Sequence, residues 1–328
     1  MKSFAFYYKP YSGKEGTENI DISELHVNIW KVDVGKYWPD YKIYIDFGMK
    51  MNQDIEFVKV YIPFEIEENG KDFDLVNTLN NNNQLLCTVF NSDLRSMTSQ
   101  TASFAPVCDE SKSEQPVEFY LHQLGATKFT LDPFKVAANN KHKTIGQILK
   151  IHIQKDSKND SKELEPNKPV YIRFRIQPKK IRDFIQSEHI SNDFLQAAFS
   201  RIDLFDVRIN ERRNLNLEVK DALTDESYKI FKFDKIHLYF MAESKEKIEN
   251  GSSIKIDSRL LECDLWKSYL PKGCHRCNYI AHHWKKRIED DKKTIKVDLD
   301  VKKLDEEVER GDKWNGGTGT CSATIGVG

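Results

Sequence analysis

The sequence predicts a β-rich α+β protein made of two mostly antiparallel, sheet-containing halves that are sandwich-like, each with a short helical crossover. Three observations lead to this prediction. Apolar residues alternate with polar ones in many segments, which is the pattern of half-buried strands. Short turns rich in Gly, Pro, Asn and Asp separate those segments. Aromatic residues make up 11% of the 328 residues, with 19 Phe and 13 Tyr, and these residue types favour strands.

The chain opens with a predicted antiparallel meander. Residues 24–33 (ELHVNIWKVD) place apolar side chains on one face, and Trp30 makes the other face partly apolar, as in a strand covered on both sides. Residues 41–49 and 55–66 alternate in the same way. Because only short polar turns join these segments, a meander is favoured over βαβ units.

The rest of the first half contains the first helical crossover. Residues 72–80 show helical spacing that the Asn run after them ends, and residues 85–90 (LLCTVF) are expected to form a buried strand. Residues 91–116 are polar and are predicted to form a flexible loop. Residues 117–124 and 144–154 resume the sheet.

Residues 155–169 are charged and rich in Ser, Asn and Pro, which is typical of a linker. This predicts an N-terminal domain over 1–155 and a C-terminal domain over 170–313. The tail over 314–328 is rich in Gly and Thr and is predicted to be flexible, with addition to a partner's sheet as the alternative.

The C-terminal half repeats the strand pattern. In residues 170–176 (VYIRFRI) the apolar residues point inward, while Arg173 and Arg175 point outward. Residues 180–200 predict a helix pair. Residues 201–213 (RIDLFDVRINERR) predict the clearest strand of the chain, with Phe205, Val207 and Ile209 on its core face. The further expected elements are strands over 228–242 and 294–301, an ambiguous segment over 260–270 and a charged helix over 302–310. Residues 279–288 lean helical by propensity but also alternate as a strand does.

Composition and motifs exclude several classes. Fifty Lys and Arg against 51 Asp and Glu give a net charge of -1, so no global field attracts nucleic acid or an anionic membrane. The six cysteines are sparse, and neither a signal-peptide core nor a long apolar run is present, so we expect a cytoplasmic protein without a membrane span. The absence of G-x-S-x-G, G-x-x-x-x-G-K, G-x-G-x-x-G and H-E-x-x-H counts against the common hydrolases, NTPases and dehydrogenases.

An arginine-bearing sheet face is the first candidate site. Arginine forks suit phosphate and carboxylate groups, and the outward side chains of two basic strands would form one patch if those strands were neighbours. The simpler alternative is a solvated face on which arginines pair with nearby acids. The predicted binding residues are Arg173, Arg175, Arg208, Asn210 and Arg212.

A Cys/His cluster is the second candidate. Cys274, Cys277 and His282 match the first three ligands of a zinc knuckle, but the fourth position falls on Arg287, which cannot bind zinc. Cys263 or His283 would have to complete the set. The alternative is reduced thiols in a turn, in which case the protein has no cofactor.

These features favour binding over catalysis. The expected function is a protein-interaction or ligand-sensing module in a larger assembly, with a protein partner, that binds an anionic group through the arginine-bearing face. Two alternatives are a metal-dependent hydrolase or nuclease that uses residues 274–283, and an RNA- or nucleotide-binding protein.

Overall fold

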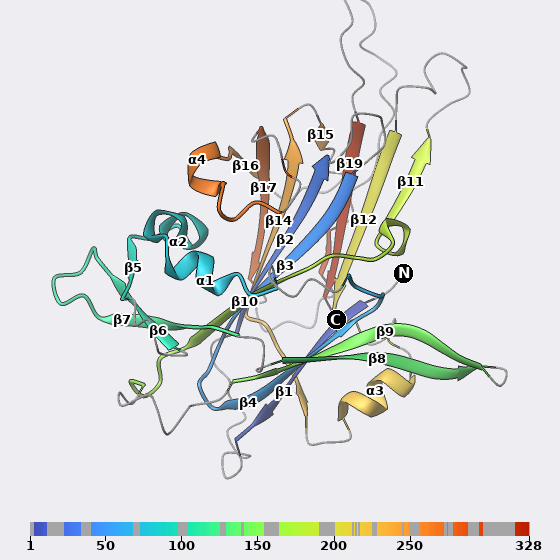
Figure 1. Cartoon of the computed structure of the whole chain (residues 1–328), viewed down its shortest axis with the longest axis horizontal. Helices are drawn as coiled ribbons and strands as arrows, with labels where there is room; N and C mark the ends of the chain where they lie inside the picture. The colour runs from blue at the N-terminus through green and yellow to red at the C-terminus, as the bar shows by residue number, and fades with distance from the viewer. Residues whose placement is uncertain are drawn as a thin grey trace, which may run out of the picture.

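The computed structural model describes residues 3–11, 23–33, 41–67, 73–97, 104–124, 129–138, 141–153, 164–189, 201–211, 213, 215, 217–224, 228–244, 246–248, 256–271, 274, 278–287, 295–297 and 319–327. Two β-sheets pack face to face, and the few helices are short (Figure 1). The predicted β-rich, mostly antiparallel and sandwich-like fold is confirmed. No helix in the described part of the chain is both long enough and apolar enough to cross a membrane.

The first sheet has nine strands. Their order is β16 (Asp257–Leu260), β17 (Tyr279–Arg287), β14 (Lys235–Glu243), β2 (Glu24–Asp33), β3 (Tyr41–Met51), β10 (Val170–Ile176), β7 (Val117–His122), β6 (Phe104–Asp109) and β5 (Leu94–Ser96). Neighbouring strands are antiparallel except for the parallel pairs β14–β2 and β10–β7.

The second sheet has ten strands. Their order is β15 (Lys247–Ile248), β19 (Gly319–Val327), β12 (Arg201–Ile209), β1 (Ser3–Pro10), β4 (Ile55–Ile62), β9 (Lys141–His152) and β8 (Phe129–Ala138), with β11 (Ile185–His189) beside β12, β13 (Lys229–Ile230) beside β1 and β18 (Ile295–Val297) beside β19. The parallel pairs are β1–β12, β12–β19 and β15–β19.

The inner faces of the two sheets form the main core. Phe205, Val207 and Ile209 of β12 are buried there, as the alternation of residues 201–213 predicts. The rings of Phe205 and Phe240 meet across the two sheets with centroids 4.6 Å apart in an edge-to-face arrangement. Burial of each such side chain contributes about 1.5–3 kcal/mol to stability.

Helices cover the outer faces of both sheets. α1 (Val76–Asn80), α2 (Asn83–Phe90) and α4 (Cys263–Trp266) pack on the nine-stranded sheet, on the side away from β12 and β19 (Figure 1). α3 (Leu217–Thr224) packs Val219 on the outer face of the ten-stranded sheet, and a 3-10 turn, η1, spans Ile181–Asp183.

The predicted strand over residues 85–90 is wrong, because these residues form α2. The Asn run does not simply end a helix. Asn82 begins the second one, since its side-chain oxygen accepts from the backbone N–H of Leu85 at 3.0 Å. Asn91 ends this helix with a left-handed φ of 51°.

The helix-leaning prediction for residues 279–288 is also wrong, because Tyr279–Arg287 is β17. This strand pairs with β14 along its whole length, and such pairing overrides weak helix propensity. The helix pair expected over 180–200 is instead η1 followed by β11 in its described part. The ambiguous segment 260–270 contains α4, and residues 302–310 lie outside the described residues.

Two segments predicted to be flexible contain strands. Residues 91–116 include β5 and β6, and the tail includes β19, which adds in parallel to β12. Each sheet also combines strands from both sides of residues 155–169, so the two layers do not coincide with two consecutive segments of the chain. The division into two domains stays a prediction.

Candidate functional site

Polar side chains gather on the outer face of the nine-stranded sheet, next to its helices. Because successive residues of a strand point to opposite faces, β2 sends its apolar residues into the core and Glu24 and His26 to the outer face. His237 of β14 lies directly beside His26 in the parallel pairing. The two imidazole centroids are 4.9 Å apart, although the residues are far apart in sequence.

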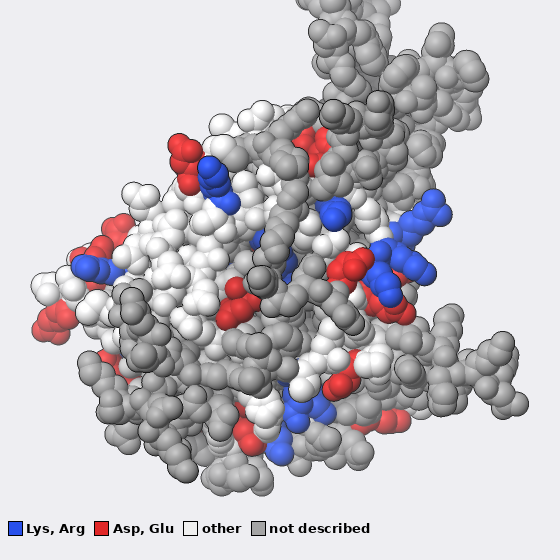
Figure 2. Space-filling view, viewed as in Figure 1, with Lys and Arg blue, Asp and Glu red and all other residues white. Residues whose placement is uncertain are grey.

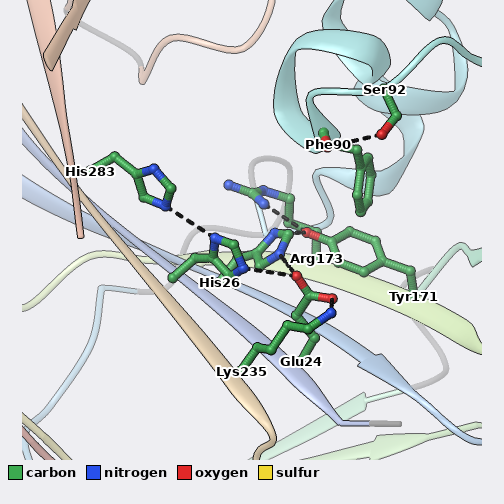
Figure 3. Close-up of polar contacts among 9 residues, drawn as sticks. Glu24, His26, Phe90, Ser92, Tyr171, Arg173, Lys235 and His283 are labelled. Carbon is green, nitrogen blue, oxygen red and sulfur yellow. Dashed lines mark hydrogen bonds and ion pairs between the residues drawn. The ribbon is translucent and has the colours of Figure 1, made fainter. Parts of the chain in front are cut away.

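Glu24, His26 and His237 bring three possible metal-binding atoms together. Nε2 of His26 lies 3.2 Å from Oε1 of Glu24 (Figure 3), and Nε2 of His237 lies 3.0 Å from the same oxygen. One ligand atom of each residue lies within 4.8 Å of the other two. The imidazoles are buried, whereas the carboxylate is 21% exposed, so the group opens to solvent on the Glu24 side.

Each imidazole is held at its other ring nitrogen. Nδ1 of His237 lies 3.0 Å from Nε2 of His283, and Nδ1 of His26 lies 3.4 Å from the Tyr171 hydroxyl. Contacts of this kind fix the orientation and tautomer of metal-binding imidazoles. The Nε2 atom of His237 is buried and makes no aligned hydrogen bond to any described residue, so it is available to an ion.

The protonation states of these groups suit a metal site. Burial raises the pKa of the Glu24 carboxyl, but the neighbouring His237 and His26 lower it by more, so its pKa lies well below the usual value. Burial lowers the pKa of His26 to about 4, against the opposing effect of Glu24. Glu24 is therefore ionised and His26 neutral at pH 7, which are the states that bind a metal ion.

The spacing of the group fits a divalent transition ion. Zinc binds imidazole nitrogen and carboxylate oxygen at about 2.0–2.2 Å, so two ligands of a tetrahedral ion lie about 3.4 Å apart. The separations of 3.0 and 3.2 Å from the Glu24 oxygen are close to this value. A tetrahedral ion held by these three residues would keep one coordination position free, as catalytic zinc sites do and structural ones do not.

Arg173 lies beside this group in an environment that is unusual for a cation. Its side chain is 0% exposed. Nη1 donates to the Tyr171 hydroxyl at 2.7 Å and Nε donates to the Tyr269 hydroxyl at 2.5 Å, while Nη2 has no hydrogen-bond partner among the described residues. Gly48 makes the space, because a Cβ there would lie 2.0 Å from the Tyr171 hydroxyl oxygen and 2.9 Å from Nη1 of Arg173.

Asp46 holds the adjoining part of the face together. It accepts from Nε and Nη2 of Arg175 at 2.6 and 2.9 Å, from Nε1 of Trp30 at 2.8 Å and from the Tyr269 hydroxyl at 2.9 Å. Asp46 and Arg175 are both buried, and a bidentate pair with all its partners in place is a structural element. Asp46 also fixes Tyr269, the hydroxyl of which receives the Nε donation from Arg173.

The structure corrects the predicted exposure of Arg173 and Arg175. The alternation of residues 170–176 places both on the outer side of β10 as predicted, but neither faces solvent, because the segment after α4 covers them. Tyr269 of that segment contacts Arg173 through its hydroxyl and Arg175 through its backbone carbonyl, which is 3.0 Å from Nη1.

The other predicted binding residues lie in the other sheet. Arg208 belongs to β12, and its Nη1 donates to Glu211 at 2.9 Å. Asn210 follows the strand with a left-handed φ of 55°, and its side chain bonds the backbone N–H of Phe6 at 2.8 Å. Asn210 therefore holds β1 against β12, and the structure does not bring it to Arg173. Arg212 lies outside the described residues.

The molecular surface shows mixed charge on the face in view. Lysines and arginines lie close to acidic residues, and neither sign forms a continuous patch among the described residues on that face (Figure 2). This agrees with the net charge of -1.

The predicted zinc set of Cys274, Cys277 and His282 is not brought together in the described residues. Cys274 lies on the outer face of the sheet, where its Sγ is 3.2 Å from the Tyr279 hydroxyl. His282 is an odd number of positions from Tyr279 on β17 and therefore points to the opposite face. Cys277 lies outside the described residues, and Cys263, a candidate fourth ligand, is disulfide-bonded.

The group of Glu24, His26 and His237 was not predicted from the sequence. The spacing of Glu24 and His26 places both on one face of a strand and is a usable signal for a pair of ligands. The third ligand comes from a strand more than 200 residues away, through the pairing of β2 with β14.

Comparisons with known proteins identified no relative of this chain. No protein-family model matches the chain, and searches of curated proteins and of solved structures found no significant match.

Proposed function

We propose that this protein is a metal-dependent enzyme of the hydrolase class, with a divalent transition ion held by Glu24, His26 and His237. The observation that carries the proposal is the convergence of two imidazole nitrogens on one carboxylate oxygen, at 3.2 and 3.0 Å. Two histidines and one glutamate are the ligand set of several zinc hydrolases, in which the open position holds a water molecule.

The surrounding residues support this role. An ion held by Glu24, His26 and His237 would lower the pKa of a bound water molecule, so that hydroxide, the attacking nucleophile, would form near neutral pH. Glu24 supplies the negative charge that holds the ion, and His283 and Tyr171 orient the two imidazoles from behind. The carboxylate side of the group is the more exposed one, which gives the route by which a substrate approaches.

A metal-dependent hydrolase was one of the alternatives predicted from the sequence, but its proposed site is now a different one. A metal-dependent hydrolase was expected at residues 274–283, whereas the ligand group proposed here lies on β2 and β14. The expectations of a protein partner, a larger assembly, an RNA or nucleotide ligand and a cytoplasmic location stay predictions.

Metal content tests the proposal. The purified protein, stripped with a chelator and reloaded with Zn²⁺ or Co²⁺, should hold one equivalent of the ion. His26→Ala and His237→Ala should each weaken binding by more than the roughly 10–100-fold that loss of an outer contact causes. His282→Ala is the matched control, because His282 lies on the opposite face of β17 and should leave binding unchanged.

Activity is the second readout. Activated esters and phosphate esters should be hydrolysed by the zinc-loaded wild type and by His282→Ala, but not by His26→Ala. A wild-type protein that binds no stoichiometric ion, or hydrolysis that survives in His26→Ala, would overturn the proposal.

A further inference from the structure

Arg173 is a buried cation that makes no hydrogen bond or ion pair with an acidic side chain in the described part of the chain. Its described hydrogen bonds go to two neutral hydroxyl groups, those of Tyr171 and Tyr269, and Nη2 has no partner among the described residues. Arg175, two residues along the same strand, has the carboxylate partner that is usual for a buried arginine, since it makes a bidentate pair with Asp46. The two arginines lie on the same strand face under the same covering segment, but only Arg175 has a carboxylate partner among the described residues.

Burial of an unpaired charge costs free energy, so we expect an anion to bind beside Arg173. A guanidinium does not lose its proton in a protein, and burial of a charge without a counter-ion strongly destabilises the folded state. The hydroxyl groups of Tyr171 and Tyr269 are neutral near pH 7, because a phenol ordinarily titrates at about pH 10, so neither of them is the missing anion. Asp46 is already engaged by Arg175.

The proposed ion adds positive charge to this part of the sheet. Arg173 and Arg175 carry two positive charges, Asp46 and Glu24 carry two negative ones, and Lys235, whose Nζ lies 4.0 Å from Glu24, adds a third positive charge. The five groups therefore sum to +1, and a divalent ion would raise the sum to +3. An anionic ligand would reduce this excess of positive charge, whereas a neutral ligand would not.

Geometry connects Arg173 to the ion-binding group. His26 and Arg173 both pair with Gly48, from opposite sides of β3, so the three residues form one row across the sheet. Because Gly48 has no side chain, Tyr171 and Arg173 lie over it and reach toward His26 (Figure 3). The Tyr171 hydroxyl accepts from Nη1 of Arg173 at 2.7 Å and lies 3.4 Å from Nδ1 of His26.

We infer that the substrate or ligand presents an oxyanion, a carboxylate or a phosphate group, to both the ion and Arg173. One oxygen takes the open position of the ion, and another accepts from Nη2 of Arg173, the donor that no described residue uses. Guanidinium groups bind both classes of oxyanion through such paired contacts. This inference rests on the proposed metal site and adds the chemical class of the molecule that binds there.

Cobalt spectroscopy of the full chain tests the inference without any substitution. Inorganic phosphate and oxalate are the two probes, and each is titrated into the Co²⁺-loaded wild-type protein. We expect the visible absorption bands of the cobalt to shift in a saturable way with at least one probe, because an oxyanion enters the coordination sphere. The stronger probe identifies the phosphate or the carboxylate class.

Variants then assign the second contact. Arg173→Gln should retain the cobalt but bind the anion about tenfold to a hundredfold more weakly, the loss expected for one charge-assisted hydrogen bond. Arg208→Gln is the matched control, because Arg208 is a strand arginine of the other sheet and should leave anion binding unchanged. If Arg173→Gln does not fold, the cobalt titration of the wild type still decides whether an oxyanion binds.

The outcomes separate the two proposals. Stoichiometric cobalt with no response to either anion overturns the oxyanion inference and leaves the metal site standing. Equal anion affinity in wild type and in a folded Arg173→Gln variant also overturns the inference. Failure to bind cobalt at all overturns both proposals.

Discussion

Replacement of Asp46 by alanine removes an acceptor on which four buried hydrogen bonds converge. Asp46 is 0% exposed and accepts from Arg175 twice, from Trp30 and from Tyr269. In Asp46→Ala the guanidinium of Arg175 stays buried without a counter-ion. The loss of one partner of a buried ion pair costs about 3–5 kcal/mol.

The other two donors add to this cost. The N–H of Trp30 and the O–H of Tyr269 would lose their acceptor in the same substitution, and each unsatisfied buried group costs about 1–3 kcal/mol unless water enters. We therefore expect Asp46→Ala to lower the free energy of unfolding by at least about 4 kcal/mol. A typical domain has about 5–15 kcal/mol in total, so the variant should lie near the limit of folding.

Urea unfolding followed by tryptophan fluorescence and by far-UV circular dichroism measures the change, and Trp30, one of five tryptophans, lies at the site. The double variant Asp46→Ala/Arg175→Met removes both charges, and it should be more stable than the sum of the single losses by about 2 kcal/mol or more. Glu65→Ala is the control, because its ion pair with Lys179 is exposed and should contribute less than about 1 kcal/mol. A loss below 1 kcal/mol for Asp46→Ala, or strict additivity in the double variant, would refute the reasoning.

Three further substitutions test other parts of the site and fold. Gly48→Ala should destabilise the protein by about 1–3 kcal/mol in urea unfolding and shift the Tyr171 ring, because the new Cβ overlaps its hydroxyl; an unchanged midpoint would contradict this. Asn82→Ala removes the side-chain cap of α2 and should cost about 1 kcal/mol, whereas Asn82→Asp should retain most of the stability. His283→Ala should weaken zinc binding by about 10–100-fold in competition with a chelator while far-UV circular dichroism stays unchanged, since it removes the contact that orients His237; wild-type affinity would contradict the outer-contact role.

The sequence by itself determined the layered β-rich fold and the faces of its strands. Trp30 indicated that residues 24–33 are covered on both sides, and it is buried. Phe205 and Ile209 were assigned to the core, and Arg173 to the opposite side of its own strand, as the structure has them. These assignments succeed because the alternation of a strand is a local property, fixed by the backbone of neighbouring residues.

Local choices between helix and strand were less certain where two patterns competed. Residues 85–90 carry apolar side chains without a clear period, and the cap at Asn82 decides for a helix. Residues 279–288 carry both a helical propensity and an alternating pattern, and the long ladder with β14 decides for a strand. In each case the deciding hydrogen bonds come from outside the segment.

Only the tertiary structure decided what the outer face of β10 meets and which residues form a site. Outward-pointing arginines were expected to face solvent, but Tyr269, nearly one hundred residues away, covers Arg173. Glu24 and His26 were visible as neighbours on a strand face, but His237 joins them only through the parallel pairing of β2 with β14. Such contacts join residues that are far apart in the sequence, so the spacing and periodicity within one segment do not predict them.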